Sequence, residues 1–192
     1  PKGKRPSNNM WTRSAGIYLD KAHDTQVPQD RESAAREALK VSLEGLAKDD
    51  SNPKLWYYAG RAYLLLDDYV GADSTFDRAE ALWSPYEEVQ RERFNAWVKA
   101  HNAGVALIQQ QKVEEAVAEM ERADLIYQGR PDTRLNLGTL YARQNDLDRA
   151  VAAYRGALEI MRSPAGADLK PEELAQWREY ENIAATRLGQ IL

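Results

Sequence analysis

The sequence contains no cysteine, and this absence excludes several kinds of chemistry. Disulfides, thiolate metal sites and thiol nucleophiles all require cysteine. Histidine is scarce as well, since only His23 and His101 occur, so few catalytic constellations can be built. Zinc-protease, nucleophile-elbow, phosphate-loop and dinucleotide-binding motifs are all missing. We therefore predict that the protein is not an enzyme and that it uses no cofactor and no metal.

The sequence also lacks an apolar run of the roughly 20 residues that a helix needs to cross a bilayer. It shows no signal-peptide pattern, and it begins with Pro1 instead of Met, as an exported protein without its leader or an excised piece would. We expect no transmembrane segment, and attachment to a membrane complex through a protein partner stays open. An exported or periplasmic location is slightly favoured over a cytoplasmic one.

Positive charge without acidic neighbours is found at only one end of the chain. The formal net charge is -4, and basic residues beyond the first thirteen positions are interleaved with acids, so nucleic acid is not an expected partner. The opening stretch "PKGKRPSNNMWTR" carries Lys2, Lys4, Arg5 and Arg13 without an acid. The sequence predicts a disordered basic tail over residues 1–9; the alternative is an arm that binds an acidic partner or lipid headgroups.

What the sequence does contain suits a helical protein with a real core. Apolar residues make up 43% of the 192 residues and charged residues 29%, with many Ala, Leu, Glu and Arg. A compact chain of this length should bury about 70% of the surface that its unfolded form exposes. This composition argues against general disorder.

One pattern of large and small residues occurs three times. In the stretch Trp56–Ala79, "WYYAGRAYLLLDDYVGADSTFDRA", a Trp is followed by Ala-Gly, Tyr and later by Ala and Phe. The same order of positions recurs over residues 100–123 and 134–158, and the step from Gly104 to Gly138 is 34 residues. Such spacing places these residues on one face of a helix, so it indicates packing.

These residues resemble the tetratricopeptide repeat, a 34-residue helix-turn-helix unit with the signature W-x2-L-G-x2-Y, A-x3-F and a closing Pro. The resemblance implies an all-α fold, a right-handed α-solenoid of antiparallel helix hairpins with about three to four repeats. We expect a single solenoid domain over residues 10–192. Its predicted parts are an irregular repeat (about 10–52), three regular repeats (53–85, 97–130 and 131–164) and a partial or capping helix (171–192).

The repeats make three local predictions. Gly within a helix costs about 1 kcal/mol relative to Ala, so Gly60, Gly104 and Gly138 indicate that the second helix of each repeat packs closely on the first. The acidic pairs in "LLDDY" and "QNDL" are expected to mark the turns and cap the second helices. In the irregular repeat, the linker "DKAHDTQVPQD" is about ten residues too long and is expected to be broken by Pro28.

Two helices are expected to be longer than the repeat requires. Both extensions follow a Ser-Pro pair, at Ser84-Pro85 and at Ser163-Pro164, and lead into acidic segments that contain Trp. The first has no internal Pro and predicts one long helix from about Tyr86 to Gln111. Such a helix would project beyond an ordinary repeat.

Similar solenoids bind partners in the concave groove that the first helices of successive repeats line. Transferred to this sequence, the groove positions comprise basic, acidic, amide, hydroxyl and aromatic side chains. They are Lys54, Tyr57, Arg61, His101, Asn102, Asp132, Asn136, Thr139 and Asn182, with the apolar Val105 and Leu135 beside them.

Three of these candidates, Asn102, Asn136 and Asn182, share one repeat position. An Asn side chain can donate to and accept from a peptide backbone, which suits an extended ligand; the alternative is that it satisfies neighbouring helix groups. The two-carboxylate clamp of some family members is not expected, because only Asn102 matches it and Asp132 would repel a carboxylate. His101 is either a pH-sensitive contact or a polar liner of the groove.

Trp83, Trp97 and Trp177 lie outside the usual motif positions. We expect them to pack the long helices onto their neighbours; the alternative is that they are exposed aromatics at a protein interface. Together these features predict a protein-interaction scaffold, or an accessory subunit of a larger complex, that binds another protein or a peptide segment. The alternatives are a self-associating solenoid, which would be a homo-oligomer, and a carrier for a small sugar or lipid.

Overall fold

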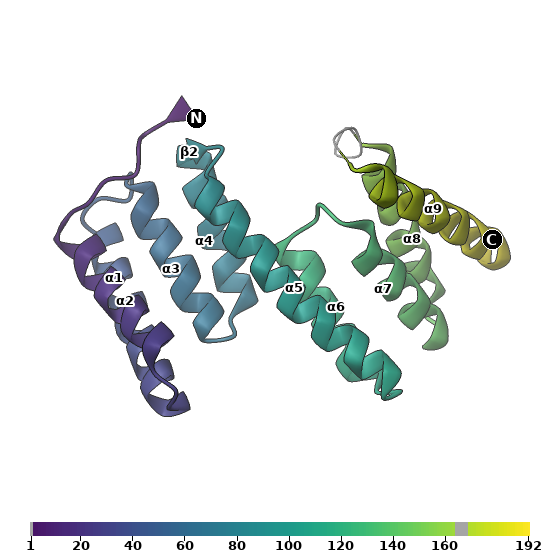
Figure 1. Ribbon diagram of the computed structural model, residues 1–192, viewed down its shortest axis with the longest axis horizontal. Helices are drawn as coiled ribbons and strands as arrows, with labels where there is room; N and C mark the ends of the chain where they lie inside the picture. The colour runs from purple at the N-terminus through teal and green to yellow at the C-terminus, as the bar shows by residue number, and fades with distance from the viewer. Residues whose placement is uncertain (1, 164–168) are drawn as a thin grey trace. The chain divides into compact units, whose positions relative to one another are not determined.

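The computed structural model describes residues 2–163 and 169–192 (Figure 1). The described residues form nine α-helices and two short strands. The helices are α1 (Met10–Asp24), α2 (Pro28–Leu46), α3 (Pro53–Leu65), α4 (Tyr69–Leu82), α5 (Glu87–Gln109), α6 (Val113–Ile126), α7 (Pro131–Arg143), α8 (Leu147–Arg162) and α9 (Pro171–Ile191). The strands are β1 (Lys2–Gly3) and β2 (Trp83–Ser84).

The chain divides into two compact units, Pro1–Asn95 (unit 1) and Ala96–Leu192 (unit 2). In unit 1, α1 packs on α2, α2 on α3 and α3 on α4, as Figure 1 shows in purple to blue. In unit 2, α6 packs on α7, α7 on α8 and α8 on α9. The predicted all-α fold of antiparallel helix hairpins is confirmed.

The turns inside the regular repeats follow the sequence prediction. Asp67, Gln111 and Asn145 have positive φ angles of 60°, 61° and 60°, a region that short polar residues tolerate better than most. The side chains of Asp68 and Asp146 then cap α4 and α8 by accepting from the backbone N–H of Gly71 and Arg149, at 2.8 and 3.1 Å. The predicted capping by the acidic pairs is therefore confirmed.

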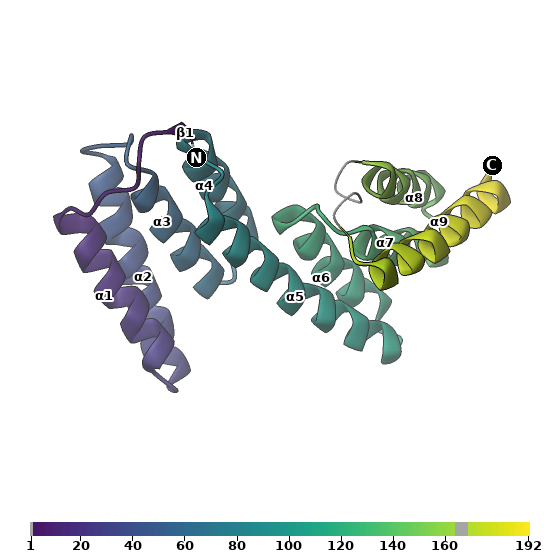
Figure 2. The same cartoon turned by 45° about the horizontal axis from the view of Figure 1, so that its top comes forward.

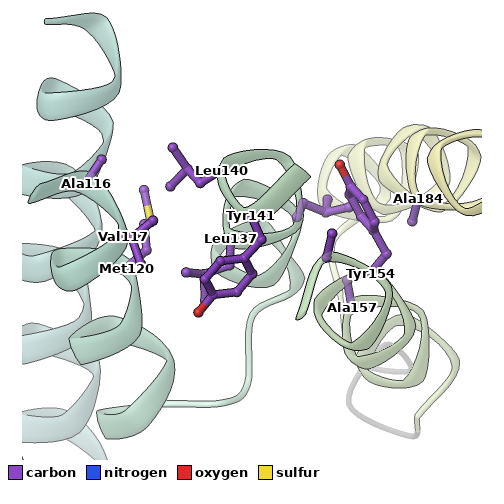
Figure 3. Close-up of a cluster of buried hydrophobic side chains, with 11 residues drawn as sticks. Ala116, Val117, Met120, Leu137, Leu140, Tyr141, Tyr154, Ala157 and Ala184 are labelled. Atoms are coloured by element: carbon purple, nitrogen blue, oxygen red, sulfur yellow. The ribbon is translucent and has the colours of Figure 1, made fainter. Parts of the chain in front are cut away.

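The glycines of the first helices are needed for close packing, as predicted. A Cβ atom at Gly104 would lie 2.8 Å from the Met120 side chain, and one at Gly138 would lie 2.7 Å from the Tyr154 ring. Gly60 faces the ring of Phe76 in the same way. In unit 2, Tyr154 is 1% exposed and joins a buried apolar cluster that extends from Met120 of α6 to Ala184 of α9 (Figure 3).

The first helix pair differs from its prediction. The linker expected to be long and broken is reduced to residues 25–27, because α1 continues to Asp24 and α2 begins at Pro28. Proline is well placed there, since the first residue of a helix has no intrahelical partner for its N–H. The extra residues lengthen both helices instead of forming a loop. Long α5, predicted from Tyr86 to Gln111, is found over Glu87–Gln109.

The N-terminal residues also differ from the prediction of a disordered tail. Strand β1, labelled in Figure 2, pairs antiparallel with β2. In this pairing Lys2 lies opposite Ser84 and Gly3 opposite Trp83. The backbone N–H of Lys4 donates to the Leu82 carbonyl at 2.9 Å. Backbone pairing of this kind does not depend on side-chain hydrophobicity, which explains why composition gave no sign of it.

Across the described ranges, none of the helices has both the length and the apolar character that crossing a bilayer requires.

Candidate functional site

In unit 1, three of the predicted groove residues line one open pocket with a volume of about 470 Å³. Lys54, Tyr57 and Arg61 reach it from α3, where spacings of three, four and seven residues place side chains on one helix face. The other lining residues come from the N-terminal segment, from α3, from β2 and the residues that follow it, and from the first turn of α5. They are Arg5, Pro6, Tyr58, Trp83, Tyr86 and Glu88.

The wall of this pocket is aromatic and held together by Glu92. The ring centroids of Tyr57 and Tyr86 are 5.4 Å apart, and the Tyr57 hydroxyl donates to Glu92 Oε1 at 3.3 Å. The same oxygen forms an ion pair with Arg61 Nε at 3.1 Å, and the Arg61 guanidinium lies 5.8 Å from the Tyr57 ring centroid. Burial raises the pKa of Tyr57 well above its ordinary value, so its hydroxyl stays a neutral donor.

The cations of the pocket are only partly neutralised. Lys54 Nζ donates to Asn8 Oδ1 at 2.7 Å and lies 5.4 Å from the Tyr58 ring centroid, but it has no ion pair with a described residue. Arg5 is exposed and likewise makes no ion pair within the described chain. Among the lining residues, three basic side chains face the single acid Glu88. With Glu92, which pairs with Arg61 in the wall, the site has three cations and two carboxylates, so it keeps a small positive charge although the chain as a whole is acidic.

Asn52 is a residue that the sequence reasoning missed. It is 1% exposed, and its side chain both accepts from the Ser7 N–H (3.3 Å) and donates to the Ser7 carbonyl (3.0 Å). Its oxygen also accepts from the Lys54 N–H and so caps α3. Asn102, Asn136 and Asn182 were predicted to bind the extended backbone of a partner through their amides. Asn52 makes this kind of contact with the backbone of its own chain. The available signal was its place just before Pro53, where a helix-capping residue is expected.

In unit 2, the side chains of His101, Thr133 and Trp97 form a hydrogen-bonded group, which is called the polar chain below. Trp97 Nε1 donates to Thr133 Oγ1 at 2.8 Å, and His101 Nδ1 lies 3.0 Å from the same hydroxyl. Thr133 is fully buried and accepts from Trp97, and its own proton is available to Nδ1 when the neutral imidazole carries its proton on Nε2. The imidazole also stacks on Trp97, with centroids 4.9 Å apart.

Burial lowers the pKa of His101, and the Arg130 charge lowers it further, against the opposing effect of Asp132. Asp132 is itself engaged, because both of its carboxylate oxygens accept from Arg130, at 3.4 and 3.3 Å. Arg130 in turn lies 5.7 Å from the Trp97 ring centroid and 3.4 Å from a Glu173 oxygen. The candidate residues His101 and Asp132 are therefore both engaged by neighbouring side chains of unit 2.

The remaining groove candidates are more open. Asn102 and Asn182 are exposed and Asn136 is half-buried, and none of the three amides makes a hydrogen bond with another described residue. Thr139 is exposed, its hydroxyl donates to the Leu135 carbonyl at 3.1 Å, and it lies 3.1 Å from the Tyr154 hydroxyl. Only the amides keep their full hydrogen-bonding capacity for another molecule.

The three unusual tryptophans divide into two kinds. Trp97 and Trp177 are 7% and 3% exposed and pack inside unit 2, so the alternative of exposed interface aromatics does not hold for them. Trp83 is half-buried and lines the unit 1 pocket. The sequence could not separate these outcomes, because the burial of a side chain depends on which helices lie opposite it.

A family model described as the tetratricopeptide repeat matches residues 131–163, which contain α7 and α8. Among solved structures, a crystal structure of MamA protein is 16% identical, with a TM-score of 0.34 over 82% of this chain and 97% of that chain. MamA from residue 41 to the end, from Desulfovibrio magneticus RS-1, is 17% identical, with a TM-score of 0.31 over 93% of each chain. A comparison with curated proteins gave no match. Residues 131–163, which form α7 and α8, are therefore a tetratricopeptide repeat.

Proposed function

We propose that the protein is a non-catalytic interaction scaffold or accessory subunit that binds a segment of another protein. The observation that carries this proposal is the unit 1 pocket, into which Lys54, Tyr57 and Arg61 all point from α3. The resemblance to the repeat had pointed to these three residues before the structure was known, and all three line one open pocket. Tetratricopeptide repeats generally use such first-helix faces to bind proteins.

Unit 2 supports the proposal through its amides. Asn102 on α5 and Asn136 on α7 leave both donors and acceptors unused by the described residues. An amide of this kind can pair with the backbone of an extended segment regardless of its sequence. We propose that each unit contributes contacts of its own, charged and aromatic in unit 1 and amide-based in unit 2.

The test is quantitative capture from an extract of the source organism, comparing the wild-type chain with Arg61→Gln and Asn136→Ala. We expect a partner protein to be retained by the wild type and reduced with both variants. Arg61 also pairs with Glu92, so the control is Arg36→Gln, which removes a more exposed ion pair to Glu32 outside the pocket. Exposed pairs of this kind contribute about 0.2–1 kcal/mol, so all three variants should melt close to the wild type.

Two outcomes would contradict this proposal. A chain that retains no protein specifically would not be a scaffold under these conditions. Loss of helicity in Asn136→Ala would show that this amide is structural, and the groove assignment in unit 2 would then fail.

Self-association is a second candidate, and one observation favours it. Helix α9 leaves Leu174 and Ile183 37% and 41% exposed while Trp177 and Ala184 are buried. A second copy could cover this apolar surface, since association generally buries such side chains. Light scattering over a range of concentrations tests it, and a mass that stays monomeric throughout would exclude it.

A further inference from the structure

The N-terminal segment is held at two points on either side of the unit 1 pocket. At one point, Lys2 and Gly3 pair with β2 and the Lys4 N–H donates to Leu82. At the other, Asn52 binds both backbone groups of Ser7. Lys4 Nζ also contacts Asp49 at 3.5 Å and the Ser51 hydroxyl. Arg5 and Pro6 lie between these points, so their backbone is kept at the pocket.

We propose that residues 2–9 are a fixed wall of this pocket and that it binds an acidic segment of a partner protein, whose carboxylates are received by Arg5, Lys54 and Arg61. This inference rests on the proposed function and names the chemistry of its ligand. It assigns a role to a basic stretch that the repeat pattern does not include, since residues 2–9 precede α1.

Charge carries the first step of the argument. Arg61 shares its charge with Glu92, but Lys54 is bound only to the neutral Asn8 and an aromatic ring, and Arg5 has no ion pair with a described residue. Two guanidinium groups and an ammonium group therefore face one hollow that contains a single lining carboxylate, Glu88. In a concave site such charges attract anions more strongly than on a flat surface.

The size of the unit 1 pocket and the chemistry of its walls also favour an acidic peptide. A volume of about 470 Å³ lies within the range of sites that accept small ligands or several side chains. The half-buried Tyr57, Tyr58 and Trp83 line the pocket beside the cations. Carboxylates can take hydrogen bonds from Arg and Lys while the methylene groups of Asp and Glu lie on aromatic rings. A peptide with several acids fits this combination better than a single small anion does.

The binding test uses fluorescence anisotropy at low salt with a labelled short polyglutamate peptide, and polylysine of equal length as the negative probe. Arg5→Ser removes an exposed cation that makes no ion pair in the described chain, so the fold should remain intact. We expect about threefold or greater weakening, in line with the value of one exposed charge contact. The matched control is Arg13→Ser, because Arg13 is an exposed cation of the same region that does not line the pocket; its affinity should equal that of the wild type.

A second variant tests the wall separately from the charge. Asn52→Ser keeps a residue that caps helices well but cannot reach both backbone groups of Ser7. All three cations remain, yet we expect polyglutamate binding to fall at least as far as in Arg5→Ser, because Arg5 is no longer held at the pocket. Faster trypsin cleavage after Lys2 or Lys4 would show independently that the segment has been released.

The inference is overturned if the wild type does not bind polyglutamate, or if Arg5→Ser and Arg13→Ser behave alike. Full displacement of the peptide by millimolar inorganic phosphate would also overturn it, since the site would then recognise a single anion. Binding to vesicles of anionic lipid without binding to polyglutamate would point to a membrane surface instead. The proposed function and this inference can fail separately. If the wild type captures a partner, Asn136→Ala captures less of it and the wild type does not bind polyglutamate, the proposed function holds and only this inference is rejected.

Discussion

The two units place side chains from equivalent repeat positions in opposite situations. In unit 1, Lys54 and Tyr57 border an open pocket and keep much of their binding capacity. In unit 2, His101 and Asp132 are engaged by Thr133 and Arg130. The difference arises because Trp97 and Arg130 occupy the space beside α7, whereas the chain next to α3 contributes further cations. A position on a repeat therefore indicates which way a side chain points, while its neighbours decide whether it is free.

The largest expected effect comes from breaking the polar chain of unit 2. Thr133→Val keeps the volume but leaves the buried Trp97 Nε1 without its acceptor and His101 Nδ1 without its donor. Buried groups left unsatisfied cost about 1–3 kcal/mol each, so we expect the free energy of unfolding to fall by about 3 kcal/mol. Urea denaturation measures it, and the exposed Thr186→Val is the matched control. Equal stability of the two variants would mean that the polar chain contributes nothing.

The second prediction concerns pH. Burial makes the pKa of His101 lower in the folded chain than the ordinary 6.5 of the unfolded chain. The unfolded state then binds more protons between these two values, so this residue's contribution to stability is complete above pH 6.5 and is lost as the pH falls towards the folded pKa. We expect the melting temperature of the wild type to fall more than that of His101→Asn between about pH 7.5 and 5.5, since the variant lacks this titration.

The exposed His23 provides the control for that comparison. His23→Asn should keep the full pH response of the wild type. If His101→Asn also keeps it, the polar chain in unit 2 does not hold the imidazole neutral, and unit 2 would be more open than the structure indicates.

The smallest effect is expected in the pocket of unit 1. Tyr57→Phe removes the hydroxyl that donates to Glu92, but Arg61 still pairs with that carboxylate and the site is open to water. We expect a loss of about 0.5–1 kcal/mol, in the range of an ordinary hydrogen bond. Urea denaturation of both variants side by side would sharpen the contrast between the units. A loss as large as that of Thr133→Val would show that the pocket wall is a structural core.

Much of the fold could be predicted because repeat packing is local. Gly60, Gly104 and Gly138, the acidic turn residues and the long α5 all follow from helical spacing within about 34 residues. The site was predicted only in part. The resemblance to the tetratricopeptide repeat pointed to Lys54, Tyr57 and Arg61, which line one pocket. The contact between Asn52 and the N-terminal segment was missed because it joins residues 45 positions apart.

The sequence by itself determined the helix pairs, their tight glycine contacts and the faces on which the candidate residues lie, because each of these depends on neighbours within one repeat. Only the tertiary structure decided that the basic N-terminal residues are ordered, that Trp97 and Trp177 are buried, and that His101 is enclosed while Lys54 is open. Those outcomes depend on backbone pairing and on hydrogen bonds between distant segments, and such contacts have no period along the chain.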